Sequence, residues 1–145
     1  MVDAQADRPT DAAAASDLFE IQSSQLALSK AQRPETRSYA QMLVQHHTQT
    51  TQATMAAAQA SGMTPPPPML LPMQQRMLDQ LRNASTASFD RLYMTQQIPA
   101  HEMALALHTN YSRAGDTPAL RQTAATAVPL VQQHFDEARR MRGAM

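Results

Sequence analysis

The side chains of this chain that could bind a metal ion are mainly imidazoles and carboxylates. The sequence of 145 residues contains five His and no Cys, which excludes disulfides, thiolate metal sites, iron–sulfur clusters and covalently attached haem. Imidazole nitrogens and carboxylate oxygens are ligands that divalent transition metals accept in proteins. Metal chemistry would therefore depend on His, on a few carboxylates and on the thioethers of 11 Met residues.

The spacing of these residues places one of them near the middle of the apolar face of each of four predicted helices. At about 100° per residue, apolar residues fall on the same side as the candidate ligand, and mostly polar residues fall opposite. Isolated polar or charged groups are costly in a core, so four of them on facing helices need a common partner. A divalent transition metal is the commonest one. The predicted ligands are Glu20, His47, His101 and His134.

Each of these residues also has an ordinary structural explanation. A single His on an apolar face is usually a core residue bonded to a backbone or hydroxyl group. Asp17 precedes Glu20 by three positions, so the two could form a variant of a capping box at the start of a helix. The metal interpretation depends on the joint occurrence of such residues on four helices.

Three further residues are supporting or alternative ligands: Asp90, His46 and His108. His46 lies about 100° away from the centre of its apolar face. Asp90 is about three turns from His101, so the two cannot bind one ion without distortion of the helix. His108 lies close to the end of the predicted bundle.

Counting residues from the turn that joins the last two helices predicts that His101 and His134 lie at different heights along the bundle. His101 and His134 differ by about 7 Å in their distance from the turn that joins these helices, and Gln97 is closer to the level of His134. Pro99 and Pro129 lie inside the two helices and could kink them, which would shift these levels.

A helical scaffold must position these residues. Ala, Gln, Met and Leu are abundant and favour helices, Gly occurs only three times, and no segment alternates as a strand would. Short connections predict two antiparallel hairpins, joined by a long Pro-rich connector. We expect an all-α, antiparallel four-helix bundle with a long crossover that carries a short extra helix. The predicted helices are 12–32, 34–61, 69–81, 85–113 and 118–142, in a single domain of residues 12–145 preceded by a flexible segment 1–11.

The charge pattern limits the partners of this bundle. Lys+Arg and Asp+Glu are both 12, and this balance argues against nucleic-acid binding and a polybasic membrane anchor. No segment approaches the ~20 apolar residues of a membrane span, and the chain as given does not begin with a signal peptide. No charged residue occurs between Arg37 and Arg76. The uncharged face of helix 34–61 is therefore either solvated or a homo-oligomer interface.

Several segments occur in an order and spacing that resemble a known family. They are Phe19-Glu20-Ile21 with Leu26-Ala27-Leu28, the stretch Tyr39 to Thr48, Phe89-Asp90-Arg91-Leu92-Tyr93, His101, and Val128-Pro129-Leu130 with His134. Over about residues 17–141 the chain resembles the exported bacterial domain-of-unknown-function family 4142. The family pattern usually has Asp-His where this chain has His46-His47. The resemblance implies a ferritin-like up-down bundle that is exported to the bacterial periplasm or cell surface, with its signal peptide removed, and it implies no function.

The ligand types favour some metals over others. No Glu or Asp precedes a His by three positions, unlike the Glu-x-x-His pairs of di-iron carboxylate proteins. A His-rich site with one carboxylate suits Zn, Cu or mononuclear Fe. Thioethers favour Cu(I), although Met also fills a core that is poor in aromatic residues. The Met residues concerned are Met94 and Met141 beside the His positions, and Met63, Met69, Met73 and Met77 near the connector.

We therefore expect a non-enzymatic, periplasmic metal-binding protein that acts as a carrier, buffer or sensor. Three alternatives stay open: a metal-free helical interaction or stress protein, a metal-dependent oxidase or hydrolase, and a haem-binding bundle. No nucleophile–base pair is recognisable in the sequence, so an enzyme is the less favoured interpretation.

Overall fold

Five α-helices and no strand make up the part of the chain that the computed structural model describes, residues 9–145. The all-α prediction is confirmed. Most of the predicted flexible segment, 1–11, lies outside the described residues. The helices are α2 (Pro9–Lys30), α3 (Pro34–Ala60), α4 (Pro72–Asn83), α5 (Thr86–Ala114) and α6 (Pro118–Gly143).

Local sequence signals begin and end these helices. Proline occupies the first turn of α3, α4 and α6, where its missing N–H costs no helical hydrogen bond. Ser85 caps α5 by accepting a hydrogen bond from the Ser88 N–H. Gly62 follows α3 with a φ of 76°, the left-handed conformation that glycine adopts without steric cost.

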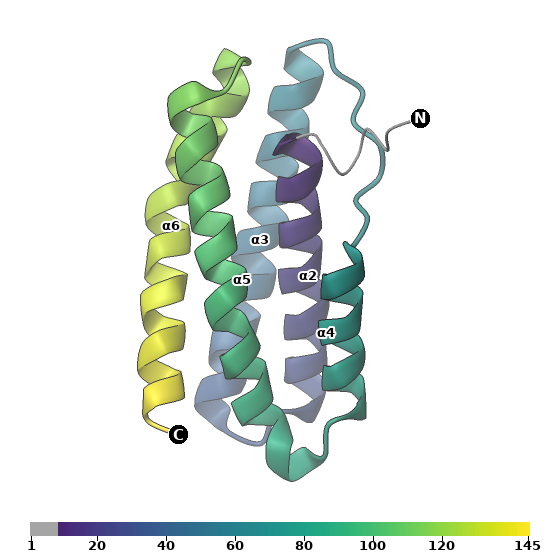
Figure 1. The fold of residues 1–145 in the computed structure, drawn as a ribbon, viewed down its shortest axis with the longest axis vertical. Coiled ribbons are helices and arrows are strands. Elements are labelled where there is room, and N and C mark those ends of the chain that lie inside the picture. Colours follow the sequence, from purple (N-terminus) through teal and green to yellow (C-terminus); the bar gives the residue numbers. More distant parts are fainter. Residues whose placement is uncertain (1–8) are drawn as a thin grey trace.

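Four long helices lie side by side and the short α4 lies against one edge of them (Figure 1). Helix α2 packs against α3 and α5, and α6 packs against α5 and α3. Helix α4 contacts α2 and α5. The connector between α3 and α4 runs back along the bundle (Figure 1), so α4 begins well below the point where α3 ends.

The core changes character along the bundle. Near the α2–α3 turn it is apolar and contains stacked Phe89 and Tyr93, with Tyr39 edge-on to Tyr93. Farther from that turn the interior of the four long helices contains buried His and acidic residues, and these residues form the candidate site.

Candidate metal centre

Three buried histidines converge from three helices. His47 on α3, His101 on α5 and His134 on α6 are 3%, 1% and 1% exposed. Their ring centroids form a nearly equilateral triangle with sides of 5.4, 5.6 and 5.9 Å. One ring nitrogen from each lies within 4.8 Å of those of the other two. Three imidazoles can therefore face one small ion.

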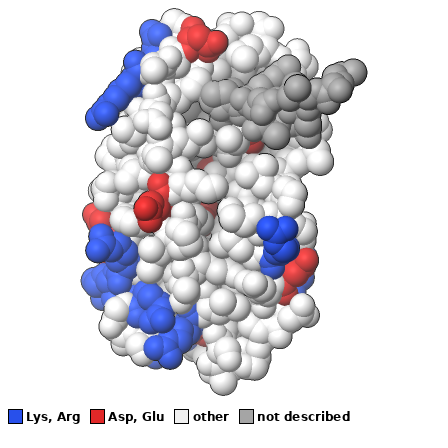
Figure 2. All heavy atoms as spheres, in the orientation of Figure 1, with Lys and Arg blue, Asp and Glu red and all other residues white. Residues whose placement is uncertain are grey.

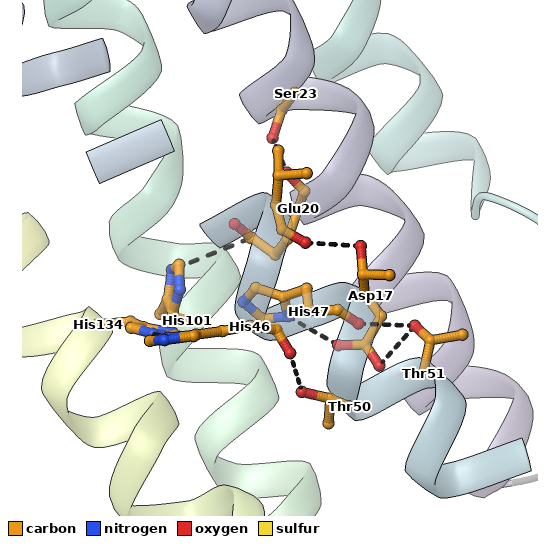
Figure 3. A network of polar contacts seen from close by, with 11 residues as sticks. Asp17, Glu20, Ser23, His46, His47, Thr50, Thr51, His101 and His134 are labelled. Carbon is orange, nitrogen blue, oxygen red and sulfur yellow. Dashed lines mark hydrogen bonds and ion pairs between the residues drawn. The ribbon is translucent and has the colours of Figure 1, made fainter. Parts of the chain in front are cut away.

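Each of these histidines uses one nitrogen for a structural contact. His47 Nδ1 lies 2.7 Å from Asp17 Oδ1, His101 Nδ1 lies 2.8 Å from the backbone oxygen of Gln97, and His134 Nε2 lies 2.8 Å from His46 Nδ1. Figure 3 shows His47 between Asp17 on one side and His101 and His134 on the other.

The second nitrogen of each ring is buried and, among the residues that the structure describes, has no hydrogen-bond partner. These atoms are His47 Nε2, His101 Nε2 and His134 Nδ1. The contacts of the first nitrogens explain which form two of these rings adopt. A backbone carbonyl only accepts, so His101 Nδ1 donates to Gln97 and its Nε2 carries the lone pair. Asp17 favours the same form of His47.

The environment keeps two of the three imidazoles neutral. Burial, reinforced by the proximity of His47, lowers the pKa of His101 to about 3. The same causes, with His101 and His46 contributing, lower the pKa of His134 to about 2. Burial alone would also lower the pKa of His47, but the hydrogen bond and charge of Asp17 outweigh it and raise this pKa above its usual value. Neutral imidazoles are the form that binds metal.

Glu20 lies beside the three histidines rather than among them. Its Oε1 is 3.9 Å from His101 Nδ1, the nitrogen already committed to Gln97. When the Gln97 carboxamide turns its NH₂ group towards Glu20, it donates to both carboxylate oxygens. Burial raises the pKa of Glu20 to about 8, so this side chain is largely neutral at pH 7 in the structure as described. Its predicted role as a direct ligand therefore stays a prediction.

Asp17 is the contact residue that the sequence reasoning missed. It is 2% exposed and binds His47 and also the Thr51 hydroxyl. The capping-box alternative is wrong, because α2 begins at Pro9 and Asp17 lies in its third turn. The available signal was its spacing of three from Glu20, which places both on one face of a helix.

The predicted axial mismatch between His101 and His134 does not keep the rings apart, since their centroids are 5.6 Å from each other. Helical side chains tilt towards the N-terminus of their own helix. Because α5 and α6 are antiparallel, the two side chains lean towards each other along the bundle axis, and this shortens the distance between the rings.

The other predicted ligands occupy different places. His46 contacts His134 from the edge of the cluster. Asp90 lies at the α2–α3 turn, where Oδ1 and Oδ2 accept the backbone N–H groups of Gln32 and Arg33 at 3.0 Å each. His108 lines a separate small cavity with residues such as Thr54 and Tyr111. Asp90 is thus a structural residue, and His108 lies outside the three-histidine cluster.

Comparisons with known proteins identify one matching family and several structures of similar fold. A family model described as "Domain of unknown function (DUF4142)" matches residues 1–141. No curated protein sequence matches the chain.

Solved structures share the fold at low sequence identity. A structure titled CopM in the Cu(I)-bound form has a TM-score of 0.79 and 20% identity, covering 93% of this chain and 93% of that one. CopM in the Cu(II)-bound form gives the same values. A DUF305 fragment from Deinococcus radiodurans has a TM-score of 0.82 and 16% identity, covering 98% of this chain and 97% of the fragment.

Proposed function

The chain belongs to the DUF4142 family, as its sequence resemblance predicted, and we propose that it binds a transition metal ion between His47, His101 and His134. Its role is to carry, buffer or sense the metal, without catalysis. Glu20 is the candidate for an additional ligand from the same core.

The unpartnered ring nitrogens carry this proposal. An unsatisfied buried polar atom costs about 1–3 kcal/mol, so three of them would cost a large share of the stability of a domain of this size. His101 Nε2 carries a lone pair because its Nδ1 donates to Gln97. His47 Nε2 carries one when His47 is neutral, and His134 Nδ1 carries one when His134 Nε2 donates to His46. One cation can accept a lone pair from each of three rings, whereas a water molecule has only two O–H groups to donate.

The donor set favours Cu or Zn over other metals. Imidazole ligands suit Zn, Cu, Fe and Ni, and the described site offers three of them. The similar structures of CopM are Cu(I)-bound, Cu(II)-bound and Ag-bound forms. That likeness of fold supports copper for this chain, with Zn as the alternative that the same nitrogens accommodate.

The surroundings favour storage or transfer over catalysis. The three rings are almost fully enclosed, and the contacts of Asp17, Gln97 and His46 hold them in place. We also propose that the fold is a ferritin-like bundle and that the protein acts after export to the bacterial periplasm. None of the described helices is long and apolar enough to cross a membrane.

Metal-dependent thermal stability tests this function. At a free Cu(II) or Zn(II) concentration of about 100 times Kd, binding should add about 2.7 kcal/mol and raise the Tm by roughly 5–10 °C. His47→Ala should abolish this increase. His108→Ala, a buried histidine outside the cluster, should retain it. An equal increase in Tm for His47→Ala and the parent protein would refute the three-histidine site.

The exposed face of α3 supports a second role, that of a metal-free interaction protein. Its Gln residues are solvent-exposed and no charge interrupts them; they are Gln41, Gln45, Gln49, Gln52 and Gln59. Uncharged polar surface is less costly to desolvate than charged surface. Under this alternative the protein self-associates without metal. A protein that stays monomeric at all concentrations in sedimentation and binds metal would rule it out.

A further inference from the structure

Methionine is unusually exposed in this protein. Of the five large hydrophobic side chains that are exposed in the described residues, four are Met, at positions 63, 69, 73 and 103. Packing alone explains a buried Met well, but it does not explain why thioethers rather than Leu or Ile reach the surface.

Three methionines line one groove between α2, α4 and α5. Met73 and Met77 are four residues apart on α4, so their Cβ atoms lie about 5–6 Å from each other on one face. Met103 on α5 lines the same groove. Met73 and Met103 are 44% and 46% exposed. Three flexible thioethers from two facing helices can therefore approach one point.

Among the described residues, the other polar side chains that line the groove are Ser16 and Gln74, whose hard oxygen and nitrogen atoms do not compete for a soft ion. The groove encloses about 340 Å³, and none of the described residues that line it is charged. Its buried amide, Gln74, uses Oε1 to accept the backbone N–H of Leu71 and thereby caps α4. The sulfur atoms are the available soft donors in this apolar surface.

We propose that Met73, Met77 and Met103 form a second metal site, selective for soft monovalent ions such as Cu(I) and Ag(I). Thioethers bind Cu(I) and need no deprotonation, so binding leaves a single positive charge in the apolar groove. A divalent ion would lose far more hydration there and would find no anionic ligand. The protein would thus have a nitrogen site for divalent metal and a sulfur site for monovalent metal. The sulfur site does not depend on the three-histidine centre.

Methionine methyl resonances test this proposal in the unaltered protein. In protein labelled with ¹³C at the Met ε-methyl groups, one equivalent of Ag(I) should shift the resonances of Met73, Met77 and Met103. The resonance of Met63, an exposed Met outside the groove, should not move. Zn(II) should leave all four unchanged. Unmoved groove resonances with saturating Ag(I) would overturn the proposal.

A leucine-substituted protein provides the matched measurement. Met73→Leu, Met77→Leu and Met103→Leu together conserve the apolar volume and remove every sulfur of the groove. In calorimetry this variant should bind one Ag(I) ion fewer than the parent protein and should bind Zn(II) as the parent does. Met63→Leu should bind both ions as the parent does. If the groove instead binds a fluorescent apolar probe that Ag(I) cannot displace, it is a site for apolar molecules and the proposal is wrong.

Discussion

The three histidines of the candidate centre are held by three different kinds of partner. His47 faces a carboxylate, His101 a backbone carbonyl and His134 another imidazole. Of these contacts, the bond to Asp17 is assisted by charge and is the strongest. A carboxylate behind an imidazole also raises its basicity as a ligand. Asp17 should therefore affect metal affinity through His47, although it is not itself a proposed ligand.

Asp17→Asn tests this role of the carboxylate. The amide oxygen can still accept from His47 Nδ1, so the ring orientation should persist while the negative charge is lost. We expect the affinity for Zn(II) to fall by about 10–100-fold, measured by competition with a chelating dye. Asp79→Asn removes an exposed carboxylate on α4 and should have no effect. Equal affinities for Asp17→Asn and the parent protein would contradict the role assigned to Asp17.

Asp90 has a structural role that depends on pH. Burial alone would raise its pKa, but hydrogen bonds from the backbone of Gln32 and Arg33 outweigh it and hold the pKa below its usual value. Asp90→Asn can accept fewer of these bonds, and we expect a loss of about 1–2 kcal/mol in unfolding free energy at pH 7.

The pH dependence of this loss follows from the lowered pKa. A carboxylate with a depressed folded-state pKa contributes its full stability above its unfolded pKa near 4 and loses it as pH falls through the folded value. The difference between the parent protein and Asp90→Asn in urea unfolding should thus shrink below pH 4. A difference that stays constant from pH 7 to pH 3 would exclude the ionised carboxylate as its cause.

For single residues, the sequence predicted which histidines face the interior better than it predicted their hydrogen-bond partners. The helical period alone places His47, His101 and His134 on inward faces, and the structure brings them together. Periodicity contains no information on which atom a ring nitrogen meets, so the bond between Asp17 and His47 could not be predicted. Glu20 shares the same face, but the choice between a metal and Gln97 as its partner depends on side-chain rotamers.

Among the elements, α4 has its C-terminal carbonyls hydrogen-bonded by one side chain from α2, beside the buried core residue Leu81. Lys30, the single lysine of the chain, donates to the backbone oxygens of Leu81, Arg82 and Ala84 at 2.8, 2.9 and 3.0 Å. Its ammonium group also lies 5.3 Å from the centre of the Phe89 ring. A cation at the end of a helix satisfies its free carbonyls and interacts well with the helix dipole.

Lys30→Met should remove these hydrogen bonds while keeping much of the apolar stem. We expect a loss of about 1.5–3 kcal/mol in unfolding free energy and faster hydrogen exchange at the amides of α4. Arg76→Met, at an exposed position of α4, should change stability by less than about 0.5 kcal/mol. Unchanged exchange in α4 for Lys30→Met would show that other contacts hold this helix.

The elements themselves were largely predictable, because Pro34 and Pro118 mark helix starts in the sequence. The short helix was predicted to begin at Met69, three residues too early, whereas α4 begins at Pro72. The start of α2 was placed three residues late, because the Ala run from Ala12 was taken as its beginning, whereas the helix begins at Pro9.

The heights of His101 and His134 along the bundle were obtained by counting backbone residues. This count leaves out the tilt of side chains towards the N-terminus of their own helix. In two antiparallel helices that tilt brings these rings closer together.

At the scale of the whole molecule, charged side chains are unevenly distributed over the face drawn in Figure 2. Figure 2 shows basic side chains gathered mainly towards one end and one side, with a broad uncharged area across the same face. The net charge of zero therefore conceals an uneven distribution. The uncharged stretch from α3 into α4 was predictable from the sequence, because no Asp, Glu, Lys or Arg occurs between Arg37 and Arg76.

Anomalous X-ray diffraction at a metal absorption edge tests the central claim most directly. In crystals of the protein loaded with one equivalent of Cu(II) or Zn(II), we predict an anomalous peak within about 2.0–2.1 Å of His47 Nε2, His101 Nε2 and His134 Nδ1. If one equivalent of metal is fully bound but its anomalous peak lies elsewhere, with no peak between these three nitrogens, the three-histidine site is contradicted.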